Sequence, residues 1–348
     1  MPFMRKFLIA AVTIIGIIFI IAKAEELGNI LETVRHGEFR FLLIAVLTEG
    51  IWLVNVAALY RAVYRVLGIE ERLPDMIVAS AAANFINVIT PTAGMGGMAV
   101  FISEAKRKRY SSARTTVASA LHLLFDYAGY LFILALGLLV LFRRGQLLMT
   151  ELLATGILLL IAAFIAAVLY LGMVSEQRLG RFLEYAARLT NKIVRPFQRD
   201  KTKAYLSIRR GYDFAHDVAE GMNELRGKPK NLIWPMLLSL SGKSLLIIVM
   251  YAVFLAFDVP ASAGTILAAV SIAFLFTVVS PTPNGIGVVE GALTLLLASF
   301  FIPLGDAAIV AITYRGVTYW LPLGIGMLAM RWLSRVEQIP PPSDSPSA

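Results

Sequence analysis

Two short motifs that break helices lie inside apolar stretches of this chain and constrain its fold more than any other feature. The first runs from Ile89 to Gly97 and the second from Val279 to Gly287; both contain a hydroxyl residue, proline and threonine in the same order. Proline cannot donate a hydrogen bond within a helix and glycine permits turns, so each motif predicts an interruption. Inside a membrane, such an interruption must be buried in protein or line a water-filled cavity.

The composition places both motifs in a membrane protein. Hydrophobic residues make up 58% of the 348 residues, the mean hydropathy is +0.74, and charged residues are only 16% of the chain. This is too apolar for a soluble domain, so we expect an all-α, multi-pass protein of the cell (inner or cytoplasmic) membrane. The full spans are expected near residues 5–22, 40–60, 113–142, 152–174, 232–257 and 307–333.

Several classes of function are disfavoured by what the sequence lacks. The chain has no cysteine, which excludes disulfides, iron–sulfur clusters and thiol catalysis, and its three histidines are scattered. Nucleotide-loop, esterase and metalloprotease motifs are also absent. We therefore expect no catalytic residues, no metal and no cofactor. The net charge of +9 is interpreted as a topology signal in basic loops and not as a nucleic-acid-binding surface.

The distribution of lysine and arginine predicts the orientation. Most basic residues fall on one side if the N- and C-termini are cytoplasmic. The hairpin-like segment 76–103 then has both ends in the cytoplasm, whereas segment 262–303, flanked by Asp258 and Asp306, has both ends outside. Two similar re-entrant hairpins that approach from opposite faces would form an inverted repeat. The expected fold is thus about six full transmembrane helices plus two re-entrant helical hairpins.

The remaining segments carry separate expectations. Residues 1–24 resemble a signal peptide, but the many spans that follow favour an uncleaved first helix. The basic cytoplasmic loop 175–231 has two amphipathic stretches, which could lie on an anionic membrane surface, recruit an enzyme partner or pack against the protein's own helices. Residues 1–335 form a single expected transmembrane domain, and the tail 336–348, rich in proline and serine, is expected to be disordered.

Placing an ionisable side chain at the centre of a transmembrane helix costs about 2.5–3.5 kcal/mol, so each such residue in the expected spans is expected to have a functional or structural role. They are Glu49, His122, Asp126, Lys243, Glu290 and Arg315. In a functional interpretation, Lys243 and Arg315 neutralise an anionic headgroup. The acidic residues and His122 then gate the site or carry a proton. In a structural interpretation, the same residues form ion pairs such as Asp126–Arg315 or Glu290–Lys243.

The two motifs themselves predict a binding site. A new half-helix can begin after each proline, and its free N–H groups would favour an anion such as phosphate near the membrane midplane. Hydroxyl and amide side chains could donate further hydrogen bonds, or could only satisfy backbone groups that proline frees. With Lys243, Arg315 and Tyr314, the expected headgroup site comprises Asn87, Thr90, Pro91, Thr92, Gly94, Ser280, Pro281, Thr282, Asn284, Gly285 and Gly287.

These residues resemble the lysylphosphatidylglycerol synthase transmembrane-region family, often called flippase-like proteins. The resemblance extends over most of residues 5–333. His122-Leu123 stands where an acidic–basic pair is often found, so an arginine-dependent role is not expected there. The matching motifs are Asn87-x-x-Thr90-Pro91 with downstream glycines, Asp126, Ser280-Pro281-x-Pro283-x-Gly285-x-Gly287-x-x-Glu290, Tyr314-Arg315 and Tyr319-Trp320-x-Pro322.

The resemblance implies a membrane module associated with lipid translocation, sometimes fused to a soluble aminoacyl-transfer domain. Only a short tail follows Arg335, so lipid aminoacylation by this chain alone is not expected. The leading hypothesis is a non-enzymatic transporter that moves an anionic phospholipid or a polyprenyl-phosphate-linked lipid between leaflets. The alternatives are a membrane glycosyl- or phosphoryl-transferase acting on a lipid carrier and a scaffold for a lipid-modifying enzyme. The lipid, the direction of movement and the oligomeric state are left open.

Overall fold

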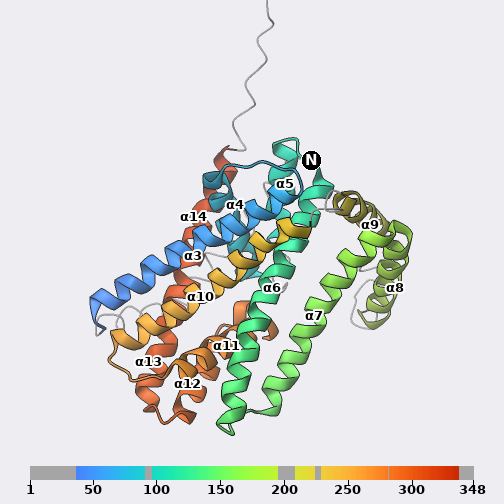
Figure 1. The fold of residues 1–348 in the computed structure, drawn as a ribbon. Coiled ribbons are helices and arrows are strands. Elements are labelled where there is room, and N and C mark those ends of the chain that lie inside the picture. Colours follow the sequence, from blue (N-terminus) through green and yellow to red (C-terminus); the bar gives the residue numbers. More distant parts are fainter. Residues whose placement is uncertain (1–36, 91–95, 195–207, 224–228, 281, 337–348) are drawn as a thin grey trace, which may run out of the picture.

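A computed structural model describes residues 37–90, 96–194, 208–223, 229–280 and 282–336. These residues form helices and the turns between them, with no strand in the described ranges (Figure 1). The all-α class expected from the sequence is therefore confirmed. Outside the described residues lie the expected first span, the tail from residue 337, and four residues of the expected site: Pro91, Thr92, Gly94 and Pro281.

Among the described residues, four helices are long and apolar enough to cross a membrane. The shortest has 24 residues and would extend about 36 Å, which exceeds the roughly 30 Å of a bilayer's hydrocarbon core. Each overlaps one of the spans expected from the sequence. The four are α3 (Phe39–Val66), α6 (Ser112–Arg143), α7 (Met149–Val174) and α10 (Ile233–Ala256).

Helices α3 and α10 pack along each other in opposite directions (Figure 1). The N–H of Glu38, at the start of α3, donates to the carbonyl of Ala256, the last residue of α10 (2.7 Å). Further along the pair, Asn55 Nδ2 donates to Ser241 Oγ (2.7 Å). The elements that follow α3 and α10 therefore begin at opposite ends of this helix pair.

Each helix of the pair leads into a hairpin that contains one of the two motifs. After α3 come α4 (Leu73–Ile89) and α5 (Met98–Arg107); after α10 come α11 (Ala263–Val279) and α12 (Val288–Ser299). The residues directly before the two prolines have extended backbone, with ψ 128° at Thr90 and 140° at Ser280. A following proline disfavours helical backbone at these positions, so both α4 and α11 end there.

The connections around the two hairpins also repeat. The same type of turn follows α3, α5, α10 and α12: a residue with positive φ, after which the next N–H donates to a carbonyl five residues earlier. Helices α4 and α11 both have 17 residues, and their bounds differ by a constant 190 residues, from 73 to 263 and from 89 to 279. The positive-φ residues of these turns are Gly68, Arg109, Asp258 and Phe301, and α6 ends with the same type of turn at Gly145.

The second tip contacts the first hairpin. The 3-10 segment η3 (Pro283–Gly285), which follows the second proline, contacts α4 of the first hairpin. Figure 1 shows α4 and α5 toward one end of the α3–α10 pair and α11 and α12 toward the other. The residues that follow the second proline therefore lie against α4 of the first hairpin, although the two hairpins begin at different ends of the helix pair.

Small residues let α6 approach the second half of the chain closely. Ser239 Oγ of α10 and Ser271 Oγ of α11 each donate to a backbone carbonyl of α6 (2.6 and 3.0 Å). Opposite these serines lie Gly129 and Gly137 of α6, where an added Cβ would overlap the serine. Such close contacts and interhelical hydrogen bonds hold helices together in a membrane, where lipid is as apolar as the helix surfaces.

The expected last span, 307–333, consists of three consecutive segments. They are α13 (Leu304–Arg315), the π-helical segment η4 (Gly316–Trp320) and α14 (Leu321–Val336). The sequence did not indicate the π-helical turn. Such turns occur often at functional sites, and this one begins directly after Arg315.

Two amphipathic helices, α8 (Glu176–Val194) and α9 (Ile208–Asn223), lie within the basic loop and contact α7 (Figure 1). The apolar face of α8 is turned toward the protein, because Leu179 and Ala187 are buried and the Phe182 ring lies 5.8 Å from that of Phe164 on α7. Of the three interpretations of this loop, packing against the protein's own helices therefore describes α8. Recruitment of an enzyme partner stays a prediction.

Packing of α14 against α4 can be tested at a glycine. A Cβ at Gly326 would lie 2.6 Å from the Ala81 carbonyl oxygen, whereas nothing lies within 4 Å of one at Gly324. We expect Gly326→Ala to lower the stability by about 1–3 kcal/mol because it overpacks the contact. Gly324→Ala should leave it unchanged or raise it by up to about 1 kcal/mol. Thermal unfolding in detergent measures both, and equal melting temperatures would contradict this packing.

Candidate functional site

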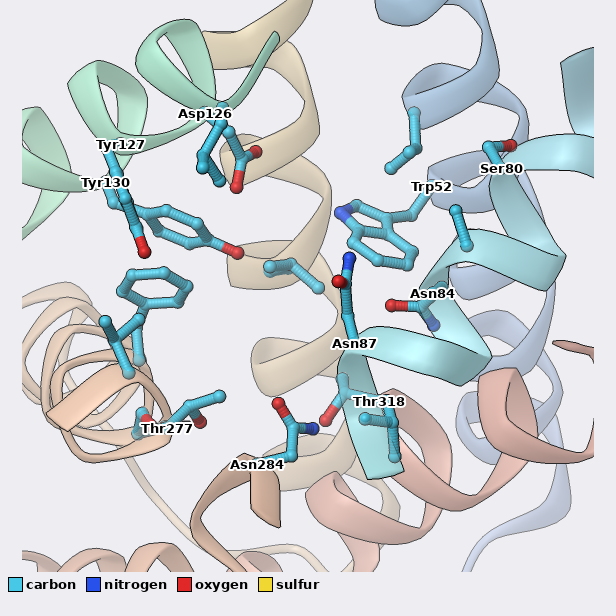
Figure 2. A pocket seen from close by; sticks show the side chains of 18 of the residues that line it. Trp52, Ser80, Asn84, Asn87, Asp126, Tyr127, Tyr130, Thr277, Asn284 and Thr318 are labelled. Carbon is cyan, nitrogen blue, oxygen red and sulfur yellow. Dashed lines mark hydrogen bonds between the residues drawn. The ribbon is translucent and has the colours of Figure 1, made fainter. Parts of the chain in front are cut away.

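A cavity of about 290 Å³ lies where the two hairpin tips meet α3, α6 and the region around η4. We call it the central cavity. Figure 2 shows Asn87 and Asn284, which come from opposite tips, around the same open space as Asp126 and Tyr130 of α6. The polar and ionisable residues of its wall include Asn84, Asn87, Thr90, His122, Asp126, Ser280, Thr282, Asn284, Tyr314, Arg315 and Thr318.

Side chains of the first tip divide between closing the interruption and facing the cavity. Asn87 Oδ1 accepts a hydrogen bond from the N–H of Gly97 (2.6 Å), the residue just before α5, and so joins the two arms of the hairpin. Thr90 Oγ1 donates to the carbonyl of Ile86 (2.6 Å). Asn84 faces the cavity, and no hydrogen bond joins it to another described residue. The Asn84 amide is therefore available to a ligand.

The second tip uses its hydroxyl groups in the same way. The N–H of Thr282 donates to Ser280 Oγ (3.2 Å), and Thr282 Oγ1 donates to the carbonyl of Ile286 (3.1 Å). Asn284, Gly285 and Gly287 have positive φ of 50°, 73° and 77°, which turns the chain into α12. The two glycines do not line the cavity, whereas the Asn284 side chain does (Figure 2).

Arg315 fastens the second tip to the helix that follows it. Its Nε donates to Glu290 Oε1 (3.0 Å), and its Nη2 donates to the carbonyl of Asn284 (2.9 Å). The guanidinium also lies over the Tyr319 ring of η4, 4.5 Å from the centroid. Arg315 is buried but lines the central cavity, and its remaining N–H groups have no partner among the described residues. Those donors are available to a ligand anion.

Asp126 and Lys243 form a second ion pair beside the cavity, between α6 and α10. The Lys243 side chain is 3% exposed, and its Nζ lies 3.2 Å from the centroid of the Tyr130 ring. Asp126 lines the central cavity, whereas Lys243 lies behind it. Both observed pairs differ from the examples considered from the sequence, because each carboxylate is joined to the other base.

The other ionisable residues singled out from the sequence lie in different settings. Glu290 lies behind Arg315 and does not line the cavity. Glu49 of α3 is fully buried away from the cavity wall, and neither of its carboxylate oxygens has a hydrogen-bond partner among the described residues. His122 does line the cavity, where its ring stacks on Tyr60 with 3.5 Å between centroids. The structure thus brings His122, Asp126 and Arg315 to one cavity and leaves Glu49 apart.

The aromatic part of the wall was missed from the sequence. Trp52 and Tyr60 of α3 and Tyr127 and Tyr130 of α6 line the cavity together with Phe274 of α11. Their spacing along α3 and α6 matches one face of a helix, the face that also carries Asp126, and this periodicity could have indicated them. Within the described ranges, no three His, Asp or Glu side chains are grouped so that they could hold a metal ion.

Comparison with known protein sequences identifies the family of this chain. The sequence model of the family described as lysylphosphatidylglycerol synthase TM region matches residues 7–326. The chain belongs to this family. That range contains both interruptions and every residue of the central cavity. The resemblance seen in the motifs is therefore confirmed for this member of the lysylphosphatidylglycerol synthase transmembrane-region family.

Two archaeal proteins are similar to the chain over nearly its whole length. The UPF0104 membrane protein MJ1595 of Methanocaldococcus jannaschii is 23% identical over 330 residues, which cover 92% of this chain and 94% of the relative. A UPF0104 membrane protein of Methanothermobacter thermautotrophicus is 24% identical over 334 residues, with coverage of 92% and 94%. Both relatives are named as membrane proteins, in agreement with the four long apolar helices.

The Asp126–Lys243 pair yields a stability prediction. Lys243→Met leaves the partly buried Asp126 carboxylate without its partner, so we expect it to lower the stability by about 1–3 kcal/mol. Adding Asp126→Asn to that variant should restore most of the loss, because the uncompensated carboxylate is then gone. Thermal unfolding of the two variants in detergent measures this difference. A double variant that melts no higher than Lys243→Met would contradict the assigned pairing.

Proposed function

We propose that this protein moves a lipid between the two leaflets of the cell membrane and holds the lipid headgroup in the central cavity. Its family and relatives are membrane proteins, and the family description refers to a lipid, lysylphosphatidylglycerol. The observation that carries the proposal is the joint lining of one cavity by Asn87 and Asn284 from two interrupted hairpins. Interrupted helices that face each other are the usual setting of a transporter's binding site.

We further propose that the two hairpins are re-entrant and form an inverted repeat, with both chain termini in the cytoplasm. The antiparallel α3–α10 pair and the matching turns around the hairpins support this arrangement. Helices α5 and α12 have 10 and 12 residues and would extend about 15 and 18 Å, roughly half of the hydrocarbon thickness. The longer arms, α4 and α11, would extend about 26 Å each, so tips near the midplane require that these arms are tilted or begin in the headgroup layer.

The proposed headgroup is anionic: the phosphate of a phospholipid or of a polyprenyl-phosphate-linked lipid. The remaining N–H donors of Arg315 face the cavity. A guanidinium group favours phosphate oxygens. The amides of Asn84 and Asn284 would bind further polar groups of the headgroup. Lys243 would act indirectly, by compensating Asp126 so that this carboxylate does not repel the anion.

We expect gating of the central cavity to depend on competition between a bound phosphate and Glu290 for Arg315. A phosphate that binds Arg315 would displace the Glu290 carboxylate, which would then be free to accept a proton. Asp126 lines the same cavity as Arg315 and is the other acidic group close to the path. His122 and Glu49 are buried with polar atoms that have no described partner, so a proton added to or taken from either would alter the local charge balance.

A reconstituted transport assay tests the proposal. In liposomes, Arg315→Ala and Glu290→Ala should reduce movement of a fluorescent anionic lipid between leaflets by about 10- to 100-fold, because a buried charge-assisted hydrogen bond contributes roughly 1.5–3 kcal/mol. Arg331→Ala removes an exposed arginine of α14 and should transport like the unchanged protein.

Gel filtration and thermal unfolding would establish that the variants are folded. Transport at the unchanged rate by folded Arg315→Ala protein would contradict the headgroup site. Turnover of a nucleotide sugar on a lipid carrier, without lipid movement, would instead favour the transferase alternative.

A further inference from the structure

A second cleft lies outside the central cavity, between the C-terminal end of α3, the start of α4 and the start of α10. Its volume is about 590 Å³, and its wall shares no residue with that of the central cavity. The wall includes Arg61, Arg65, Asn231, Trp234 and Leu238. We propose that this interfacial cleft binds the phosphate and upper acyl chain of an anionic phospholipid that stays bound at the membrane surface.

The two arginines form the polar end of the cleft. Arg61 and Arg65 are one helical turn apart on α3, so their side chains extend from the same face. Arg61 Nε donates to the carbonyl of Glu71 (2.9 Å), which fixes the guanidinium and leaves its two terminal NH₂ groups for a ligand. Neither side chain has an ion-pair partner among the described residues. A planar guanidinium binds two phosphate oxygens at once, which makes a pair of arginines a strong phosphate site.

Two acidic residues close to this pair, Glu71 and Asp75, both contact Lys108. Both carboxylate oxygens of Glu71 lie 2.8 Å from Lys108 Nζ, and Asp75 lies 3.3 Å from it. Burial alone would lower the pKa of Lys108, but Glu71 and Asp75 raise it above its ordinary value. The lysine therefore stays charged and offsets one of the two acidic charges, so Lys108, the two arginines and the two acids together keep a net charge of one positive unit. The two arginines keep their charge for a ligand.

The position along α3 favours a lipid over a free phosphate. Between Phe41 and Tyr60, α3 carries no charge other than Glu49, and this run of 20 residues, 41 to 60, would cross the roughly 30 Å of a hydrocarbon core. Arg61 follows this run directly. The arginines therefore lie at the depth of lipid phosphates, where a basic residue attracts anionic lipids.

The rest of the cleft suits the apolar part of a lipid. Trp234, at the start of α10, is 62% exposed, and tryptophan favours the boundary between headgroups and acyl chains. Ala58, before Arg61 on α3, and Leu238, one turn after Trp234 on α10, continue the wall toward the membrane interior. A free phosphate ion would use only the arginines and Asn231, whereas a phospholipid would use both ends of the cleft.

Native mass spectrometry of the full chain, released from nanodiscs of phosphatidylcholine with one part in five of phosphatidylglycerol, tests the inference. The unchanged protein should retain phosphatidylglycerol in preference to phosphatidylcholine. Arg61→Gln with Arg65→Gln should reduce this retention about tenfold. Arg178→Gln with Arg181→Gln is the matched control: it removes two exposed arginines of α8 and should keep the retention unchanged.

Two further measurements make the outcome decisive. Arg65→Gln alone removes an exposed side chain without a described hydrogen bond, so it should fold normally and still lower the retention. Excess inorganic phosphate should not displace the lipid. Equal retention in the cleft variant and the control, or an equal loss in both, would overturn the proposal. Displacement by phosphate with no lipid preference would assign the cleft to the free ion instead. None of these results depends on transport through the central cavity.

Discussion

The backbone at an interrupted helix has to find hydrogen-bond partners within the protein. The rest of this structure depends on which groups supply those hydrogen bonds. Asn87 closes the first interruption by accepting from the N–H of Gly97, and Arg315 holds the second by donating to the carbonyl of Asn284. Hydroxyl groups at both tips satisfy further backbone groups. Because polar backbone exposed to lipid would cost several kcal/mol, each tip has to be covered by the other half of the chain. The central cavity is what remains between the two covered tips.

Buried charged side chains also find their partners within the protein. Buried Lys243 and Arg315 are each joined to a carboxylate, so the wall of the cavity has no large excess of either sign. Burying either base without its acid would cost several kcal/mol. The two pairs differ in position: Asp126 faces the cavity in one, and Arg315 faces it in the other. One acidic and one basic group are therefore presented to a ligand, and each is held in place by a partner behind the wall.

Local rules of the chain predicted four of the spans and the ends of α4 and α11, and contacts between distant residues explain what the sequence did not predict. Proline at 91 and 281 ends α4 and α11 through its own geometry, and the length of the apolar runs indicates α3, α6, α7 and α10. The ion-pair partners depend on how α6 packs against α10 and how α12 folds back on α13, which no short sequence window contains. The role of Asn87 in closing its own hairpin, and the π-helical turn after Arg315, depend on packing in the same way.

Labelling with a membrane-impermeant thiol reagent tests the central claim most directly, since the chain contains no cysteine of its own. Single cysteines at Asn84 and Asn284 would report from the two tips, and Leu293→Cys, at a fully buried apolar position of α12, gives the rate for a dry site. If both tips line one water-filled cavity, the first two positions should react at least about tenfold faster than the third. Reaction at both tips as slow as at Leu293 would mean that dry packing fills the space between them, and the proposed headgroup site would be wrong.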